Sequence, residues 1–175
     1  MLPRPEQRGV IRPYVEADEG GVVALWNVVF PDDPPWNSPP EVIRLKLSVQ
    51  REFFLVCQSD GAVVGTVLAG FDGVRGWVHK LAVHPDHQGQ GIGTRLMVAA
   101  EEGLAALGCP KINLQVRASN SGAADFYLRA GYVVEDRISM GKHLGPQPYA
   151  QDSRDVGMVP GADERPSNRG DATDR

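Results

Sequence analysis

A glycine-rich segment constrains the fold of this 175-residue chain more than any other feature: Gln88-Gly-Gln-Gly-Ile-Gly-Thr94. It follows an apolar run that ends at Val83 and precedes a long amphipathic pattern, so it reads as a turn between a strand and a helix. Its three glycines lack Cβ atoms, and successive backbone N–H groups can therefore turn inward and approach a ligand closely. The helix that begins there adds unpaired N–H groups and the positive end of its dipole. The segment predicts a phosphate or pyrophosphate site, with tight strand-to-helix packing as the alternative.

Two nucleotide-binding motifs with similar glycine spacing do not fit this turn. A P-loop requires Lys-Ser or Lys-Thr after its last glycine, whereas Gly93 is followed by Thr94-Arg95. A Rossmann fingerprint belongs to the first βαβ unit and needs an acidic residue at the end of the next strand. The next predicted strand, 111–116, is instead followed by Arg117. Neither nucleotide motif is met.

Hydrophobic periodicity and turn residues predict a single α/β domain with a mixed sheet, in the order β-α-α-β-β-β-α-β-α-β. Five prolines between Phe30 and Pro40 exclude regular structure there, and Pro40 suits the first turn of the second helix. Asp18 is expected to cap the first helix. We expect a flexible leader over 1–9, the folded domain over 10–145 and a disordered tail over 146–175. The predicted strands are 10–14, 52–58, 62–69, 77–83, 111–116 and 132–140, and the two later helices begin near 92 and 121 and end at Gly108 and Gly131.

Composition narrows the classes of partner and location. The formal net charge of −4 and the pI of about 5.5 make nucleic acid and anionic lipid unlikely partners. The chain has no apolar stretch near the roughly 18 residues that a membrane span needs, and its first residues lack a signal-peptide core. Cys57 and Cys109 form neither a metal-type pair nor a disulfide pattern. We therefore expect a cytoplasmic protein with two reduced thiols.

Three sequence blocks together resemble the GNAT superfamily of acyl-CoA N-acyltransferases. The family signature of Gln or Arg, two residues, Gly, one residue, then Gly or Ala is matched by Gln88 to Gly93. The preceding Leu81-Ala-Val-His-Pro85 is similar to the family's Leu-x-Val-x-Pro strand. Downstream, Asn120, Tyr127 and Gly131-Tyr132 match the family's Asn, Tyr and Gly-Phe/Tyr pattern. The resemblance covers roughly 10–145 and is strongest from 77 to 132.

The resemblance implies a fold and a cofactor site. It implies a mixed sheet of six to seven strands with about four helices, whose fourth and fifth strands splay apart at a bulge to admit the pantetheine arm. It implies acetyl-CoA as co-substrate, with the pantetheine on the backbone of the fourth strand and the pyrophosphate on the amides of the glycine-rich turn. The residues expected to contact the cofactor are Leu81, Ala82, Val83, Gln88, Gly89, Gln90, Gly91, Ile92, Gly93, Thr94, Asn120 and Tyr127.

Two residues are the candidate catalytic groups. Tyr127 occupies the family position of the tyrosine whose hydroxyl points at the CoA sulfur, and a phenol with a pKa near ~10 stays protonated at neutral pH to serve as an acid. The alternative for Tyr127 is an ordinary core aromatic beside Phe126. His79 matches a histidine of the arylalkylamine branch and would act as the base, directly or through water. A satisfied polar residue is the alternative for His79, and other candidate bases are Asp72, Glu52 and Tyr14.

The expected activity is transfer of an acetyl group from acetyl-CoA to a primary amine of a small molecule or peptide, by direct attack in a ternary complex. A non-catalytic acyl-CoA sensor and an unrelated phosphate-binding protein are the competing hypotheses. No metal site is expected, because His84 and His87 have no further ligand cluster nearby. Trp36 and the loop 31–40 either shape the acceptor pocket or pack over the first helix. More narrowly, Pro35-Trp-Asn37 and Gly108 to Lys111 look like small bacterial GNAT acetyltransferases of undefined substrate, in which homodimers are common.

Overall fold

A five-stranded mixed sheet forms the centre of the computed structural model, which describes residues 9–144. The strand order is β1-β2-β3-β4-β5; the first four strands pair antiparallel and β5 pairs parallel to β4. The predicted leader and tail fall almost wholly outside the described residues. The strands are β1 (Val10–Pro13), β2 (Phe54–Ser59), β3 (Ala62–Phe71), β4 (Gly76–Val83) and β5 (Ile112–Asn113).

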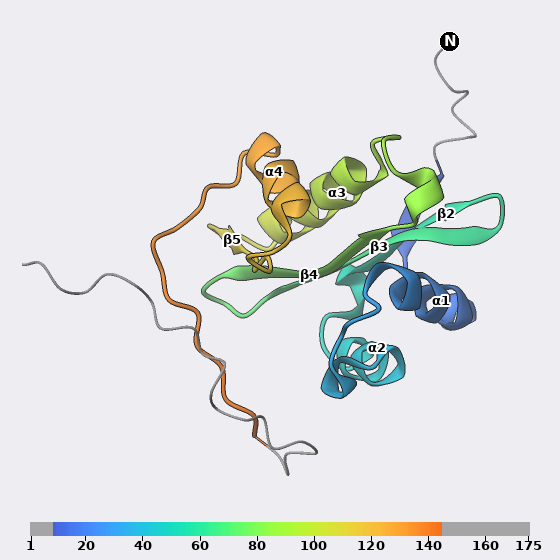
Figure 1. The fold of residues 1–175 in the computed structure, drawn as a ribbon, viewed down its shortest axis with the longest axis horizontal. Helices are drawn as coiled ribbons and strands as arrows, with labels where there is room; N and C mark the ends of the chain where they lie inside the picture. Colours follow the sequence, from blue (N-terminus) through green and yellow to red (C-terminus); the bar gives the residue numbers. More distant parts are fainter. Residues whose placement is uncertain (1–8, 145–175) are drawn as a thin grey trace, which may run out of the picture. The chain divides into compact units, whose positions relative to one another are not determined.

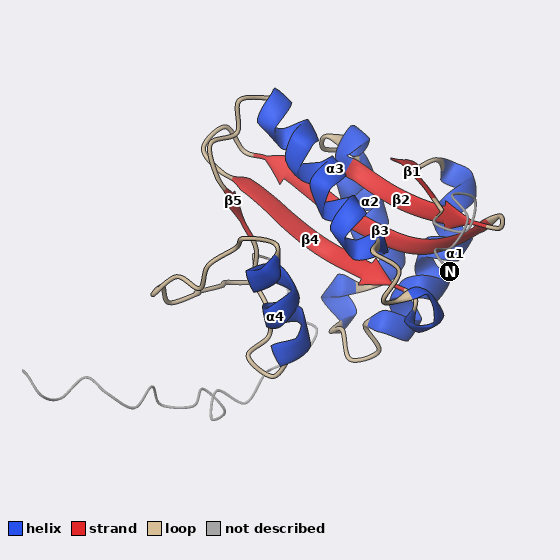
Figure 2. Cartoon of the chain, turned by 90° about the horizontal axis from the view of Figure 1, so that it is seen from above, coloured by secondary structure: helices blue, strands red, loops and turns tan. Residues whose placement is uncertain are grey.

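Four α-helices cover the two faces of this sheet (Figures 1 and 2). Helices α1 and α2 lie on one face, and α3 and α4 lie on the other. The predicted helices are confirmed, including Pro40 in the first turn of α2 and the glycine at +80° in φ that follows α3; α2 begins one residue earlier, at Pro39. The helices are α1 (Glu19–Val29), α2 (Pro39–Leu47), α3 (Ile92–Ala106) and α4 (Ser121–Arg129).

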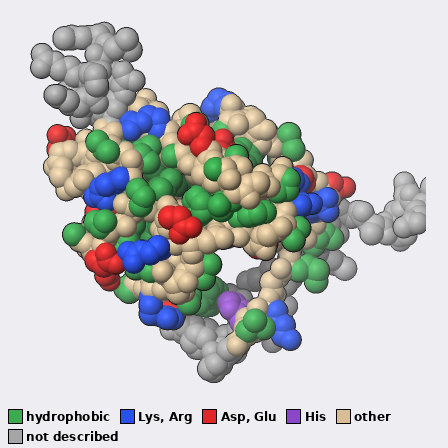
Figure 3. All heavy atoms as spheres, turned by 180° about the vertical axis from the view of Figure 1, so that it is seen from behind, with side chains coloured by type: hydrophobic (Ala, Val, Ile, Leu, Met, Phe, Trp, Pro, Cys, Tyr) green, Lys and Arg blue, Asp and Glu red, His purple; other side chains and the backbone are tan. Residues whose placement is uncertain are grey.

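Each face of the sheet has its own hydrophobic core. Strand residues alternate between the two cores, because successive side chains of a strand point to opposite faces. Acidic, basic and apolar side chains are interspersed over the face of the molecule in Figure 3. The α3 face buries Phe53, Leu55, Cys57, Val64, Val67, Ala69, Val78, Ile92, Leu96, Met97, Ala100 and Leu104. The α1/α2 face buries Tyr14, Val22, Leu25, Trp26, Ile43, Phe54, Val56, Leu68 and Ala82.

Strand β4 contains a bulge that breaks this alternation. Thr66 of β3 lies opposite Ala82, and Leu68 lies opposite His79, so two steps along β3 match three along β4. Lys80 occupies the extra position with a φ of 50°, in the left-handed region. The bulge therefore turns two consecutive side chains, those of His79 and Lys80, toward the α1/α2 face.

Strands β4 and β5 separate just before the bulge. Their register contains only Gly76 opposite Ile112 and Trp77 opposite Asn113. The expected strand 111–116 is thus shortened to two residues, and the second half of β4 has no paired strand on that edge among the described residues. This is the splayed arrangement that the resemblance implied.

The expected final strand over 132–140 is wrong, and the described sheet has five strands rather than six to seven. The segment has a strand-like composition, but it pairs with no strand among the residues described. Val133 and Val134, at the end of one compact unit, are 75% and 84% exposed. Ile138 and Met140, in the unit that begins at Glu135, are 84% and 91% exposed. Strand propensity without a pairing partner does not make a strand, because its backbone groups stay bonded to water.

Candidate functional site

The glycine-rich turn has the backbone geometry that a phosphate site requires. Gly89 and Gly91 have φ values of 73° and 76°, in the left-handed region, and Gly91 immediately precedes α3. A Cβ added at either glycine meets no atom within 4 Å, so these glycines serve the backbone conformation rather than close packing. Gln88 fixes the turn to β4, because its Nε2 donates to the carbonyl of Val83 at 3.1 Å. The first N–H groups of α3, which have no partner within the helix, follow this turn at the positive end of the helix dipole.

The remaining residues of the turn divide between backbone and packing roles. The side chain of Ile92 is 2% exposed in the α3 core, which leaves only its peptide group for a ligand. A Cβ on Gly93 would lie 3.5 Å from the Phe126 ring, so this glycine also sits close to α4. Gln90 reaches back to the carbonyl of Asp86 at 3.5 Å, and Thr94 is exposed on the first turn of α3. Amides rather than side chains are the donors that this turn offers.

The second half of β4 directs N–H groups toward the gap between the splayed strands. The N–H of His84 donates to the carbonyl of Val64 on β3 at 2.9 Å. Because N–H groups alternate in direction along a strand, those of Leu81 and Val83 point to the opposite edge, where β5 has separated. By the same alternation the N–H of Ala82 points to β3, and its side chain is buried against the α1/α2 face. Leu81 and Val83 are thus the β4 residues placed to bind a ligand in the gap.

A buried hydrogen-bond chain fixes the bulge. Trp26 on α1 donates from Nε1 to the hydroxyl of Thr66 at 2.8 Å, and Thr66 donates to the carbonyl of Lys80 at 3.1 Å. Both side chains are almost fully buried, at 1% and 0% exposed. This hydrogen-bond chain was not predictable from the sequence, because nothing local marks a threonine in a valine-rich strand as the partner of a residue 14 positions later.

Tyr127 and Asn120 lie on α4, on the α3 face of the sheet. Asn120 caps the helix, since its Oδ1 accepts from the N–H of Ala123 at 3.1 Å. Tyr127 packs against the α3 core, with ring centroids 5.1 Å from Phe126 and 5.7 Å from Tyr132. Burial raises the pKa of Tyr127 to about 12. Its phenol is therefore protonated at neutral pH and can only donate to a developing anion.

His79 lies on the opposite face of the sheet from Tyr127. Its ring stacks parallel to that of Trp77, with the centroids 6.3 Å apart. The side chain is exposed, yet neighbouring protein atoms displace enough solvent that desolvation lowers the pKa of the imidazole, and the positive charge of Lys46 lowers it further. A neutral imidazole at pH 7 can accept a proton, as a base for an amine requires.

The other candidate bases have structural roles or unfavourable protonation. Asp72 accepts from the N–H groups of Val74 and Arg75 at 2.8 and 2.7 Å, and these backbone bonds lower the pKa of its carboxyl. Tyr14 is 3% exposed and stacks on Phe54 at 4.5 Å; burial raises the pKa of its hydroxyl, which has no hydrogen-bond partner within residues 9–144. Glu52 lies in a short 3-10 turn before β2. Asp72 and Tyr14 are therefore poorly suited as bases, whereas His79 and Glu52 both have exposed side chains, and His79 adjoins the bulge.

A cavity of about 320 Å³ lies on the α1/α2 face beside the bulge. Trp26, Phe30 and four prolines give it apolar walls, and Asn37, Ser38 and Lys80 add polar groups. The proline-rich loop is held over it by Asp33, whose carboxylate pairs with Lys80 and accepts from Nη2 of Arg117 at 2.8 Å. The loop 31–39 thus shapes this cavity, while Trp36 is not among the residues that line it.

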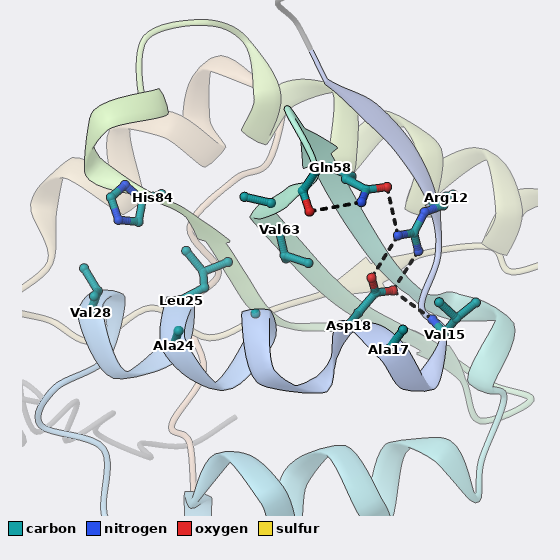
Figure 4. Close-up of a pocket in the computed structure, with 13 residues that line it drawn as sticks. Arg12, Val15, Ala17, Asp18, Ala24, Leu25, Val28, Gln58, Val63 and His84 are labelled. Atoms are coloured by element: carbon teal, nitrogen blue, oxygen red, sulfur yellow. Dashed lines mark hydrogen bonds and ion pairs between the residues drawn. The ribbon is translucent and has the colours of Figure 1, made fainter.

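A larger cavity of about 520 Å³ lies between α1 and the β2–β3 hairpin (Figure 4). Its polar end is a closed network in which Arg12 donates to both oxygens of Asp18, at 2.7 and 2.8 Å, and to Gln58 at 3.1 Å. Asp18 also accepts from the N–H of Val15, so it caps a 3-10 turn rather than α1 as predicted. None of the predicted site residues lines this cavity.

The two thiols and His84 lie outside the candidate site. Burial raises the pKa of Cys57, and Cys109 donates to the carbonyl of Lys111 at 3.3 Å. His84 accepts from the N–H of Asp86 at 3.3 Å. Within residues 9–144, no three His, Cys, Asp or Glu side chains gather as a metal site would require, and no helix is long and apolar enough to cross a membrane.

Comparison with known proteins identifies the family. The sequence profile of the acetyltransferase (GNAT) family matches residues 21–132. The chain is 40% identical over 136 residues to acetyltransferase YE1169 of Yersinia enterocolitica, covering 77% of this chain and 94% of that protein. Its fold is similar to the PaiA N-acetyltransferase of Thermoplasma acidophilum, solved in complex with coenzyme A, with a TM-score of 0.64, 19% identity and coverage of 74% and 92%.

A second solved structure, the enzyme AAC(6')-Iy in complex with the bisubstrate analogue CoA-S-monomethyl-acetylneamine, has the same fold. Its TM-score is 0.63 at 14% identity, over 77% of this chain and 97% of that one. The family match and the long alignment to a named acetyltransferase agree with the splayed strands and the glycine-rich turn described above. The chain therefore belongs to the acetyltransferase (GNAT) family, as an N-acetyltransferase with acetyl-CoA as its acyl donor.

Proposed function

We propose that this enzyme transfers the acetyl group directly from acetyl-CoA to a primary amine, within one ternary complex. The observation that carries the proposal is the geometry of β4. Its gap edge presents the N–H groups of Leu81 and Val83 to the donor, while the adjacent bulge turns His79 toward the other face. Donor and acceptor would then approach the gap from opposite sides of the sheet.

Donor binding rests on backbone groups. The amides of Gly89, Gly91, Gly93 and Thr94 would hold the pyrophosphate, since they lie at the start of α3 where its dipole favours negative charge. Leu81 and Val83 would hold the pantetheine arm along the strand, and one of their N–H groups would polarise the thioester carbonyl. Gln88, Gln90 and Ile92 shape the turn, and Asn120 orders the start of α4.

Acetyl-CoA supplies a thioester whose thiolate leaves when the amine attacks. Tyr127 would give its phenolic proton to that sulfur, because its raised pKa keeps it protonated until the thiolate forms. His79 would take the proton that the amine loses, directly or through water. The C–N bond forms and the C–S bond breaks. The proton that Tyr127 gives to the thiolate is balanced by the proton that His79 takes from the amine.

Direct attack is favoured over an acyl-enzyme by the state of the two cysteines. Cys57 is fully buried, with a pKa raised by desolvation, so little of it is the thiolate that would be needed to attack. Cys109 directs its thiol to a backbone carbonyl beside β5. AAC(6')-Iy binds an analogue that joins CoA to its acceptor, which is the arrangement a ternary complex would have.

The test is acetyl-CoA turnover against a panel of primary amines, with Tyr127→Phe as the variant. We expect acetylated product from the wild type and a kcat lower by roughly 100-fold in the variant, within the usual range for loss of a general acid. Acetyl-CoA affinity should stay within a few fold, since the ring remains. Tight binding of acetyl-CoA without acetylation of any amine would favour a sensor instead. A variant as fast as the wild type would remove Tyr127 from the reaction.

A further inference from the structure

The three-residue cluster of Asp33, Lys80 and Arg117 sits beside the proposed acceptor side of β4. Asp33 belongs to the proline-rich loop, Lys80 to the bulge and Arg117 to the segment after β5. The Asp33 carboxylate pairs with Lys80 through Oδ2 and with Arg117 through Oδ1. The side chains of Asp33 and Lys80 are only 15% and 11% exposed. The cluster therefore links the loop to both sides of the gap between the splayed strands.

The charge of this cluster is not balanced. One carboxylate faces two cations, which leaves a net charge of +1. Asp33 and Lys80 are the charged residues among those that line the adjoining cavity. The ammonium of Lys80 also lies 5.2 Å from the ring centroid of Trp26 and 4.6 Å from that of Phe30, so aromatic faces as well as Asp33 hold it in place. Lys80 is thus held in place as part of the cavity wall.

Arg117 is the member of the cluster that can still bind a further group. Its side chain is 60% exposed, and it donates to Asp33 through one nitrogen, Nη2. A guanidinium carries five N–H donors in a planar fork that matches a carboxylate. Within residues 9–144, Asp33 is the acceptor for Arg117, so the remaining N–H donors can bind a second carboxylate in the position that the surplus charge favours.

We propose that the acceptor is an amine that carries its own carboxylate beside an apolar group, as an apolar α-amino acid does. The proposal rests on the proposed function. Arg117 would bind the carboxylate, the walls formed by Trp26, Phe30 and the prolines would hold the apolar side chain, and the amine would face the gap near His79. Arg117 is then a specificity-determining residue for the acceptor.

The same charges disfavour polycationic acceptors. A polyamine or an aminoglycoside needs unpaired carboxylates at the mouth of its site, whereas Asp33 is already shared between two cations. Like charges at short range cost binding free energy, so a second ammonium group near Arg117 would be repelled. Selectivity here comes from repulsion as well as from the new ion pair.

The experiment compares phenylalanine with 2-phenylethylamine, which differ by the carboxylate alone. Initial rates of acetyl-CoA turnover give kcat/KM for each amine with the wild type, Arg117→Gln and Arg44→Gln. Arg44 is a matched control, because it is also exposed and paired with a carboxylate, Glu41, but lies on α2 away from the cluster. When the ratio between the two amines is compared between wild type and variant, their different intrinsic reactivities cancel.

We expect the wild type to prefer phenylalanine by about tenfold or more, which is the range for one charge-assisted pair. Arg117→Gln should lower that ratio by about tenfold, mainly through a higher KM for phenylalanine, while Arg44→Gln should leave it unchanged. An equal or greater kcat/KM for 2-phenylethylamine with the wild type overturns the proposal and leaves the acetyltransferase activity standing. A preference that survives in Arg117→Gln also overturns it. Failure to acetylate any amine of the panel rejects the proposed function itself.

Discussion

The two sides of β4 offer different kinds of recognition. Toward α3, the proposed donor side has the amides of the glycine-rich turn, and the N–H groups of Leu81 and Val83 face the adjoining gap. Toward α1 and α2, the acceptor side presents side chains from three distant segments, Asp33, Lys80 and Arg117. In our proposal, backbone groups hold the coenzyme and side chains select the acceptor. The bulge at Lys80 allows one strand to serve both purposes.

The largest expected effect comes from straining the backbone of the glycine-rich turn, on the proposed donor side. Gly91→Val places a β-branched residue at a φ of 76°, which costs roughly 1–2 kcal/mol of stability and displaces the amides at the start of α3. We expect the affinity for CoA, measured by calorimetry, to fall roughly 100-fold, or about 2.7 kcal/mol.

Gly108→Val is the matched control at the other end of α3. Gly108 has a φ of 80° and open space around its Cβ position, as Gly91 does. It should lose a similar amount of stability and keep its affinity for CoA. Equal loss of affinity in both variants would mean that the turn acts through folding and not through its amides.

The bulge itself is tested by Thr66→Val. This change removes the acceptor of the Trp26 N–H and the donor to the Lys80 carbonyl, both in a buried site. Two unsatisfied groups should lower the free energy of unfolding by about 2–3 kcal/mol, measured by urea denaturation. We also expect kcat/KM for acetyl-CoA to fall by roughly tenfold, because the edge of β4 that faces the gap loses its support.

Thr66→Ser is the control that restores the hydroxyl without the methyl group. It should recover most of the lost kcat/KM, although a smaller loss of stability remains. If Thr66→Val matched the wild type in both measurements, the hydrogen-bond chain would have no part in shaping the gap.

The α1/α2 face contains a second carboxylate–arginine pair, Asp18 with Arg12, which can be compared with the pair of Asp33 and Arg117. Asp18 is 6% exposed in its side chain, and the hydrogen bond from Arg12 lowers the pKa of its carboxyl below the ordinary value. Asp18→Asn should cost about 2 kcal/mol of stability at pH 7 and leave the acceptor preference unchanged, because this network is closed.

The pH dependence of that stability has a definite sign. A carboxyl whose pKa is lowered on folding stabilises the protein above its unfolded pKa, near ~3.9, and loses this contribution as the pH falls through the folded value. Urea denaturation between pH 7 and pH 3 should therefore show the gap between wild type and Asp18→Asn closing at the acid end. A gap that is constant with pH would show that packing, and not the ionised pair, carries the effect.

The smallest expected effect concerns His79. Desolvation and the charge of Lys46 lower the pKa of its imidazole, so kcat/KM for the amine should fall only at pH values below the ordinary pKa of 6.5. Lys46→Gln removes the charge and should move this acid limb upward by less than one pH unit. Arg44→Gln, a charge change on the exposed side of the same helix, should leave it in place. An acid limb that ignores Lys46→Gln would assign the base to another group.

Most of the fold was predictable because its signals are local. The turn at Asp60-Gly61, with φ values of 49° and 81°, joins β2 and β3 as a hairpin, which an Asp-Gly pair favours. The amphipathic pattern after the glycine-rich turn forms α3, whose buried residues run from Ile92 to Leu104, and Gly108 follows the helix as expected. The strand over 132–140 was not predictable in this way, since a strand depends on a partner elsewhere in the chain.

The candidate site likewise contains residues that local sequence signals predict and residues that they do not. The glycine-rich turn, Tyr127 and His79 were recognisable in the sequence, because a motif or a family position marks each of them. Thr66, Asp33 and Arg117 carried no such mark. The nearest partner of Asp33 is 47 positions away in sequence and the other is 84 away, and no local pattern reports contacts of that range.

The sequence by itself determined the helices, the first four strands, the glycine-rich turn and the family, because periodicity, turn residues and short motifs act through neighbouring residues. Only the tertiary structure decided where β4 parts from β5, toward which face each of its side chains points and which charges meet beside the cavity on the α1/α2 face. Those features depend on residues brought together by packing, and their free energies arise from contacts that exist only once both cores have formed.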